Sequence, residues 1–168
     1  MKQIKINVTM KVKNMYEFML RDAYLGIGGV GSVLFSVAMA IYFFAAYDTL
    51  HGGQRVLVGI GALLFIVINP LVILFNSTKQ VKLNPTFRDM LTYTLSEDGV
   101  LVEQNNQEVL VKWDEFWKAV ETPQSIIIHI TKKRAFILPK YAIGDELKEV
   151  KELICTQMGQ EKCKFKKA

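Results

Sequence analysis

The sequence predicts a hairpin of two membrane-spanning α-helices joined to a small cytosolic α+β domain, a bent antiparallel sheet closed by a C-terminal helix. Three observations predict this fold: two long uncharged stretches, the uneven distribution of lysine and arginine around them, and apolar–polar alternation in much of the remaining chain. No charged residue occurs in residues 23–47 or 56–78. A helix rises about 1.5 Å per residue, so each stretch can cross the roughly 30 Å hydrocarbon core of a bilayer.

Positive charge lies almost entirely outside the segment between the two spans. Five lysines and arginines precede the first span, Arg55 alone lies in the turn 48–55, and fifteen follow the second span. Lysine and arginine concentrate on the cytoplasmic side of membrane proteins. We therefore expect a multi-pass protein of the cytoplasmic membrane with both termini in the cytoplasm.

The chain before the first span predicts a strand and then a short helix. Apolar and polar side chains alternate from residue 4 to residue 12, which is the period of a half-buried strand, and we assign residues 1–13 to it. Asn14 fits a helix N-cap, and Glu17, three residues later, completes a capping box. Residues 14–78 then comprise an amphipathic interfacial helix and the two-span hairpin.

The first span contains a glycine motif that does not predict a nucleotide site. Residues 26–31 fit the dinucleotide pattern GxGxxG, but no parallel-strand pattern precedes them and the next acidic residue lies across the membrane. Small residues recur at every fourth position of this span and permit close helix packing in lipid. This packing seam comprises Gly28, Ser32, Ser36 and Ala40, with Gly59 and Ala62 as small partners on the second span. It pairs either the two spans or two molecules of a homo-oligomer, and the sequence leaves both alternatives open.

The second span contains Asn69 and Pro70. Proline removes the hydrogen bond to the carbonyl of Ile66, so a kink is expected there, with Asn69 helping to satisfy the freed backbone. Neither span contains an ionisable acidic, basic or histidine side chain, which argues against a proton or ion pathway.

The chain after a connector at 79–90 predicts a meander of short strands and a final helix. Alternation is found in residues 91–95, 100–102, 109–113, 126–130 and 134–138, with turn residues between them. Residues 114–120 fit either a strand or one helical turn. A helix begins near Gly144 and carries an apolar stripe, so the domain covers residues 91–158 and is followed by a basic tail at 159–168.

Several motifs resemble those of the YcxB-like family of small bacterial membrane proteins. They are Tyr-Thr-Leu-Ser-Glu-Asp-Gly at 93–99, Val-Lys-Trp-Asp-Glu-Phe at 111–116 and Ile-Leu-Pro-Lys at 137–140. The resemblance covers nearly the whole chain and implies a pleckstrin-homology-like (PH-like) cytosolic domain. It also implies that the N-terminal strand joins the cytosolic sheet and that Trp113 and Pro139 determine the fold. It brings no established activity and no catalytic residues.

The residues that carry enzyme chemistry are sparse. His51 lies in the outer turn and His129 in the cytosolic domain, so one site cannot use both. Cys155 and Cys163 do not form a CxxC pair, and a reducing cytoplasm disfavours a disulfide between them. No phosphate loop, serine elbow or apolar pair of carboxylates is present. We expect a non-enzyme without cofactor or metal.

Two basic clusters are candidate contacts for anionic lipid headgroups or an acidic partner. They comprise Lys132, Lys133, Arg134, Lys162, Lys164, Lys166 and Lys167. The alternatives are a solvated turn for the first cluster and a solvated terminus for the second. Nucleic acid is not expected as a partner, because no aromatic platform or nucleic-acid-binding module accompanies the basic residues.

These observations favour a binding or regulatory module that docks a protein partner at the inner face of the membrane. A sheet edge offers one concrete mode, because it can accept a peptide strand through backbone hydrogen bonds. The alternative is an immunity protein that protects its producer against a bacteriocin or secreted membrane-active toxin. In that alternative, the spans and their outer aromatic rim meet the toxin.

Overall fold

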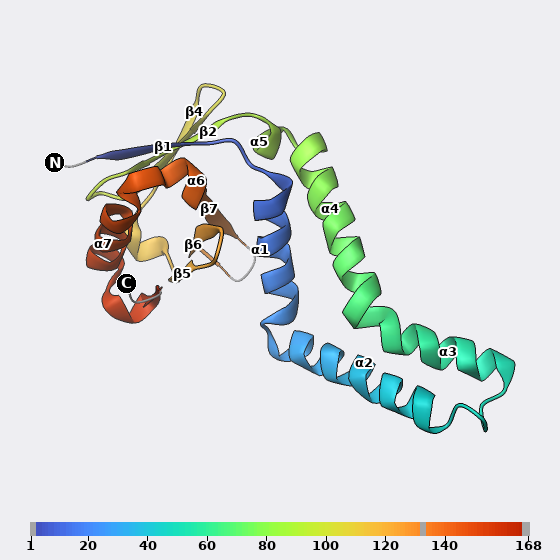
Figure 1. The fold of residues 1–168 in the computed structure, drawn as a ribbon. Coiled ribbons are helices and arrows are strands. Elements are labelled where there is room, and N and C mark those ends of the chain that lie inside the picture. Colours follow the sequence, from blue (N-terminus) through green and yellow to red (C-terminus); the bar gives the residue numbers. More distant parts are fainter. Residues whose placement is uncertain (1–2, 132–133, 166–168) are drawn as a thin grey trace. The chain divides into compact units, whose positions relative to one another are not determined.

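A computed structural model describes residues 3–131 and 134–165. The chain divides into a helical unit, Met15–Lys79, and a sheet unit formed by the chain up to Asn14 and from Gln80 onward (Figure 1). The helical unit is thus an insertion between the first strand and the remainder of the sheet unit.

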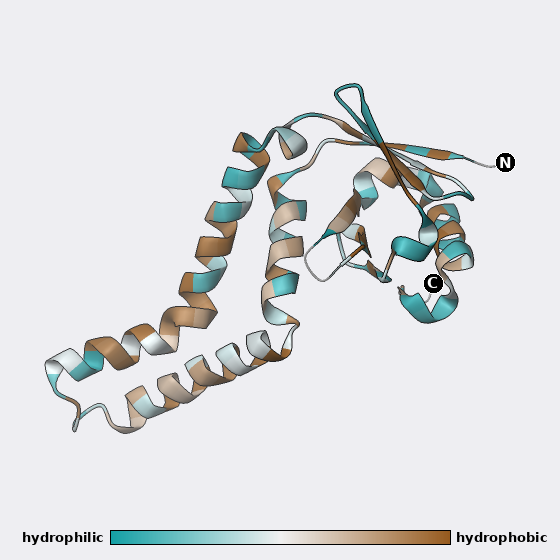
Figure 2. Cartoon of the chain, turned by 180° about the vertical axis from the view of Figure 1, so that it is seen from behind, coloured by the Kyte–Doolittle hydropathy of each residue, from teal (hydrophilic) through white to brown (hydrophobic). Residues whose placement is uncertain are grey.

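The helical unit comprises two long apolar helices and a shorter helix that leads into them. The elements are α1 (Val12–Tyr24), α2 (Ile27–Ala45), α3 (Gly52–Leu63), a π-helical segment (Leu64–Ile68) and α4 (Asn69–Leu83). α2 and the continuous 32-residue helix Gly52–Leu83 are both long and apolar enough to cross a membrane. In the most apolar 18-residue stretch of each helix, only 6% and 17% of the residues are buried. Figure 2 shows many apolar residues along α2, α3 and the adjoining half of α4.

The predicted first span, 23–47, is not one continuous helix. α1 ends at Tyr24, Leu25 and Gly26 break the helix, and α2 begins at Ile27. Gly29 permits this break, because a Cβ atom at that position would overlap the carbonyl oxygen of Ala23. In Figure 1, α1 lies beside α4 and α2 beside α3, so each arm of the helical pair changes direction at its own junction.

The first four strands form an antiparallel sheet with the order β1-β2-β3-β4. Their bounds are β1 (Ile4–Val8), β2 (Leu91–Leu95), β3 (Val100–Gln104) and β4 (Gln107–Val111). β1 pairs with β2 across the helical insertion, with Ile6 opposite Tyr93. Asn105 and Asn106, with φ of 47° and 61°, form the two-residue turn between β3 and β4. Positive φ at both central residues is typical of a type I′ hairpin turn, which asparagine tolerates.

The second sheet has the order β7-β6-β5-β8. It contains β5 (Lys118–Glu121), β6 (Ser125–His129), β7 (Ala135–Pro139) and the two-residue β8 (Cys163–Lys164), which pairs with β5 in parallel. The short helices α5 (Pro85–Arg88) and α6 (Lys140–Ile143) precede β2 and follow β7, and α7 (Leu147–Met158) is the final long helix. The ambiguous stretch 114–120 divides into a 3₁₀ turn, Trp113–Glu115, and β5.

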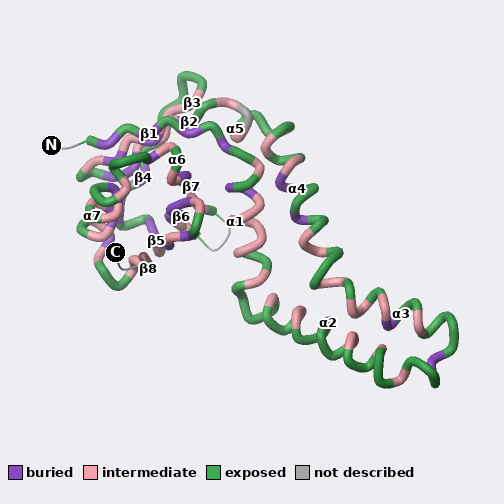
Figure 3. Tube along the Cα trace, viewed as in Figure 1, coloured by how far each residue is buried: buried purple, intermediate pink, exposed green. Residues whose placement is uncertain are grey.

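The core of the sheet unit lies between the inner faces of the strands and α7, where Figure 3 shows the buried residues concentrated. β1 and β2 each bury every second residue, as the alternation predicted. Trp113 is buried, and its indole nitrogen donates a hydrogen bond to the carbonyl of Ser96 at 2.8 Å. Val150, Ile154 and Met158 bury one face of α7. Each fully buried side chain of this size contributes about 1.5–3 kcal/mol to folding.

Asn14 is not the helix N-cap that the sequence predicted. α1 begins two residues earlier, at Val12, and the Asn14 side chain is buried. Its amide donates a hydrogen bond to the hydroxyl of Ser125 at 3.0 Å. A contact with a residue so distant in sequence has no local signature, so the local capping pattern was misleading here.

Candidate functional site

A polar junction joins the two apolar helices at the π-helical segment. The Ser36 hydroxyl donates to the Gly61 carbonyl at 3.0 Å and accepts from the Phe65 amide at 3.1 Å. In an α-helix these two backbone groups, four residues apart, would bond to each other. The hydroxyl is therefore inserted into the helix ladder, which is a recognised cause of helix kinks and accompanies the π-helical turn here.

At the kink expected at Pro70, the carbonyl that lacks a backbone donor is not the predicted one. The Asn69 amide bonds to the carbonyl of Leu64, five residues back, so the register is shifted by one residue before the proline. The Phe65 carbonyl, five residues before Pro70, accepts a hydrogen bond from the Tyr24 hydroxyl at 2.5 Å. The Asn69 side chain donates to the same hydroxyl at 3.0 Å. The carbonyl of Phe65, rather than that of Ile66, thus takes a donor from outside its own helix. Asn69 contributes indirectly, because its side chain donates to the Tyr24 hydroxyl that bonds to this carbonyl.

The predicted packing seam is only partly in contact. Gly28 is exposed, Ser32 bonds to the Gly28 carbonyl of its own helix at 2.8 Å, and Ser36 is fully buried. Ala40, Gly59 and Ala62 are half-buried. The closest approach on α3 is at Gly61, where a Cβ atom would lie 2.9 Å from the terminal methyl of Met39.

Two open hollows flank Tyr24 within the helical unit. One has a volume of about 400 Å³ and is lined by residues that include Gly26, Ser32 and Asn69. The other, of about 470 Å³, is mainly apolar and has Arg21 and Pro70 in its lining. Both follow from the helix break and the π-helical turn, which prevent the helices from packing uniformly along their length.

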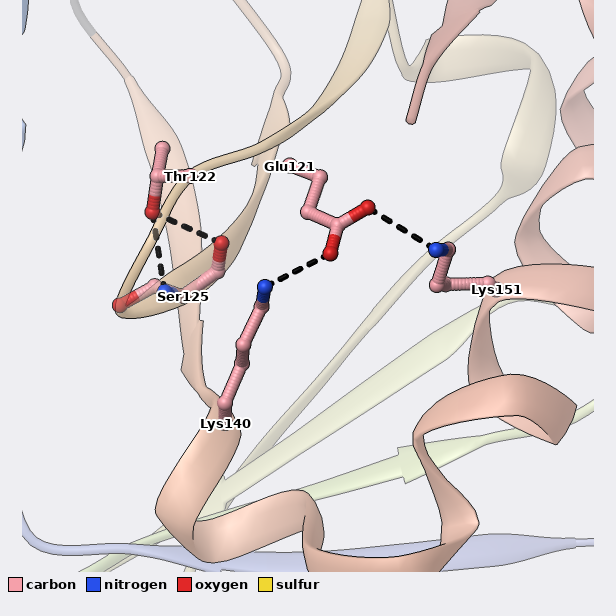
Figure 4. Close-up of polar contacts among 5 residues, drawn as sticks. All are labelled: Glu121, Thr122, Ser125, Lys140 and Lys151. Atoms are coloured by element: carbon pink, nitrogen blue, oxygen red, sulfur yellow. Dashed lines mark hydrogen bonds and ion pairs between the residues drawn. The ribbon is translucent and has the colours of Figure 1, made fainter. Parts of the chain in front are cut away.

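An ionic cluster in the sheet unit joins β5 to the two C-terminal helices (Figure 4). The Glu121 carboxylate pairs with Lys140 of α6 at 2.6 Å and with Lys151 of α7 at 2.9 Å. Its side chain is only 6% exposed. One carboxylate that satisfies two ammonium groups holds these elements together, so we interpret the cluster as structural.

The turn between β5 and β6 is fixed beside this cluster. The Thr122 hydroxyl donates to the Ser125 carbonyl at 2.8 Å and accepts from the Ser125 amide at 2.9 Å, as Figure 4 shows. Both residues are buried. The Ser125 hydroxyl is engaged by Asn14, so this serine serves as a packing partner.

The two cysteines lie against each other at the end of α7. Both are free thiols, and Cys155 is close enough to influence the ionisation of Cys163. Burial, and then the neighbouring Cys155, raise the pKa of Cys163 to about 12. A thiol that retains its proton is a poor nucleophile and a poor metal ligand. No cluster of three metal-binding side chains occurs in the described residues.

The predicted basic clusters lie only partly within the described residues. Lys132, Lys133, Lys166 and Lys167 lie outside them. Arg134 and Lys164 are exposed. Lys162 donates to the carbonyl of Phe116 at 3.3 Å, so its ammonium group is engaged within the fold.

Sequence reasoning did not identify the β4 edge as a distinct surface. β4 is the last strand of its sheet, and its first four residues are exposed. Glu108 lies directly opposite Glu103 of β3. The available signal was the Asn105–Asn106 turn, which fixes the register and therefore the residues that face outward.

The chain thus joins two long, exposed apolar helices to a separate antiparallel sheet unit closed by a helix. Residues 95–154, which lie within the sheet unit, match the family described as YcxB-like protein. The chain is also 24% identical over 140 residues to the uncharacterized protein YcxB of Bacillus subtilis (strain 168). The aligned region covers 74% of this chain and 76% of that relative. The predicted resemblance to the YcxB-like family is therefore confirmed, with the family match lying at residues 95–154. No solved structure matches the chain significantly.

Proposed function

We propose that the chain is a membrane-anchored, non-catalytic binding module that docks a protein partner at the inner face of the cytoplasmic membrane. The observation that carries this proposal is the helical unit, whose apolar helices are exposed along most of their length. An exposed apolar surface of this extent supports placement of these helices in a lipid bilayer. The few charges of the turn at 48–55 and the basic flanks favour an inner location for the sheet unit.

The sheet unit provides the binding surface in this proposal. Two mainly antiparallel sheets and the helix α7 are compatible with the PH-like domain that the family resemblance implies. The ionic, hydroxyl and thiol groups described above are engaged in internal contacts, which supports a scaffold rather than a reaction centre. Arg134, Lys164 and the remaining basic residues would orient the unit on anionic headgroups.

The test is crosslinking of the tagged full-length chain in its own membranes, followed by purification and mass spectrometry. The proposal predicts one dominant protein partner that is absent when an unrelated two-span anchor carries the same tag. Recovery of lipid and self-crosslinked chain alone would contradict partner docking.

The immunity alternative has support from the outer end of the helical unit. Phe43 makes edge-to-face ring contacts with Phe44 and Tyr47, and Arg55 stacks over the Tyr47 ring. Phe44 and Tyr47 are also exposed, so an aromatic rim is available to a membrane-active peptide. Expression in toxin-sensitive cells tests this alternative: survival that requires the aromatic rim supports it, whereas unchanged killing contradicts it.

A further inference from the structure

Among the described strands, β4 is a five-residue edge strand, and its first four residues are exposed. At the opposite edge of the same sheet, β1 contacts α6, and the chain just after it is held by Tyr141, which donates to the Thr9 carbonyl. In the second sheet, β7 contacts β1 and α6, and the other edge, β8, is only two residues long. Figure 1 shows the β3–β4 hairpin extending past the neighbouring strands.

The hairpin register determines which backbone groups of β4 face outward. The two-residue turn makes Gln104 and Gln107 the closing hydrogen-bonded pair. Hydrogen-bonded pairs alternate along an antiparallel ladder, so the amide and carbonyl groups of Glu108 and Leu110 point away from β3. No backbone hydrogen bond outside the β3–β4 ladder engages either residue within the described part of the chain. These groups can accept an additional strand.

Apolar side chains on β4 are left uncovered on both faces of the sheet. Val109 lies opposite Val102 on the inner face, which the core covers elsewhere, yet it is 57% exposed. Leu110 lies on the outer face and is 47% exposed. A strand paired with β4 would bring its own alternate side chains against both residues.

The charge around this edge is acidic. Residues 97–116 contain six acidic residues and one lysine. Glu103 and Glu108 are directly opposed, an arrangement that is unfavourable unless a cation lies nearby. Glu103 pairs with Lys5 at 3.6 Å, whereas no ion pair engages Glu108 among residues 3–131 and 134–165. A basic side chain on an added strand would complete the pairing.

We propose that β4 binds an extended segment of a partner protein in which lysine or arginine alternates with apolar residues. The segment adds to the sheet through the backbone groups of Glu108 and Leu110, places a basic residue beside Glu108 and covers Val109 with an apolar one. The inference rests on the proposed docking function and specifies its partner. Pairing of β4 with a second copy of the chain is disfavoured, because residues 107–111 contain no basic residue, so no register of that pairing would place a cation beside Glu108.

The test uses the full-length chain in nanodiscs of zwitterionic lipid, so that basic peptides are not attracted to the bilayer. The probe is a fluorescent ten-residue peptide that alternates lysine and valine, and binding is followed by anisotropy. A peptide that alternates glutamate and valine serves as the charge control. We expect the lysine peptide to bind and the glutamate peptide not to bind.

Two variants locate the site, and a third is the matched control. Leu110→Pro removes an outward amide without removing a bond to β3, a substitution that edge strands tolerate, and should abolish binding. Glu108→Lys should weaken binding by about tenfold, equivalent to about 1.4 kcal/mol. Glu152→Lys makes the same charge change on the exposed face of α7 and should leave binding unchanged. If Leu110→Pro alters the tryptophan fluorescence of the chain, Glu108→Lys carries the test.

The outcomes separate this inference from the proposed function. Equal peptide binding by wild type and Glu108→Lys, or no binding by wild type, would overturn the β4 site. A crosslinked cellular partner that is retained by both β4 variants would overturn it too, while the docking function would stand. A dimer of the chain that dissociates in Leu110→Pro would show that the edge binds a second copy and would overturn the assignment to a partner protein.

Discussion

The hydroxyl of Ser36 in α2 donates a hydrogen bond to the carbonyl oxygen of Gly61 in α3, at 3.0 Å. The same hydroxyl accepts from the Phe65 amide, so one side chain of α2 occupies the backbone ladder of the neighbouring helix. This contact fixes the rotation and the height of α2 relative to α3. At this level Ser36, a member of the predicted seam, contacts the second apolar helix of the same chain.

Replacement of Ser36 by alanine should destabilise the helical unit by about 1 kcal/mol, because both backbone groups lose their side-chain partner. The measurement is equilibrium unfolding of the full chain in mixed micelles, followed by helical circular dichroism. Ser32→Ala is the matched control, since the Ser32 hydroxyl bonds only within its own helix. Equal effects of the two substitutions would contradict the role assigned to Ser36.

Gly29→Ala should destabilise the same unit by about 1–3 kcal/mol, the usual cost of overpacking. The added methyl would overlap the backbone at Ala23 and force the α1–α2 break to open. Gly28→Ala places the same methyl in open space and should have no cost. The same unfolding assay measures both variants, and a neutral Gly29→Ala would show that the break relaxes freely.

The strands were predictable because alternation of side chains is a local property. The pattern at Ile4–Val8 and Leu91–Leu95 marks the buried face, and the structure follows it residue by residue. The membrane-length helices were predictable for the same reason, since length and hydropathy are read directly from the sequence.

Features that depend on distant contacts were not predictable. The π-helical turn accompanies the contact of Ser36 with Gly61 and Phe65, and no local pattern indicates that contact. The Asn14 side chain bonds to a residue 111 positions away, so its capping signature was misleading. The exposed edge at β4 was not predictable, because edge status depends on sheet order.

Glu121→Gln should destabilise the sheet unit by about 2 kcal/mol, because Lys140 and Lys151 lose a shared, buried carboxylate. Glu103, the ion-pair partner of Lys5, is more exposed than Glu121. Glu103→Gln should therefore cost less than about 1 kcal/mol. Chemical unfolding of the full chain, monitored by tryptophan fluorescence, to which buried Trp113 contributes, compares the two variants. A cost for Glu121→Gln no larger than that for Glu103→Gln would show that the cluster does not hold β5 to the helices.

Tyr93→Phe should improve stability in alkali. Burial raises the pKa of Tyr93 above its usual value of 10.0. The folded state therefore holds the proton more tightly than the unfolded state, and the associated stability is complete below about pH 10 and is lost as pH rises toward the folded pKa. Phenylalanine has no such proton.

The Tyr93→Phe measurement is urea unfolding of wild type and variant at neutral pH and at a series of values above about pH 10. The difference in free energy of unfolding should shift in favour of the variant only in the alkaline range. A constant difference at all pH values would mean that Tyr93 ionises equally well in both states.

The most direct test of the central claim is thiol labelling of the chain in intact protoplasts with a membrane-impermeant maleimide. In a Cys155→Ser, Cys163→Ser background, Thr49→Cys places a thiol in the exposed segment between α2 and α3, and Glu97→Cys places one on the sheet unit. A membrane anchor with an inner sheet unit predicts labelling of Thr49→Cys in intact protoplasts and of Glu97→Cys only after lysis. Labelling of Glu97→Cys before lysis, or of Thr49→Cys only after it, would contradict the account.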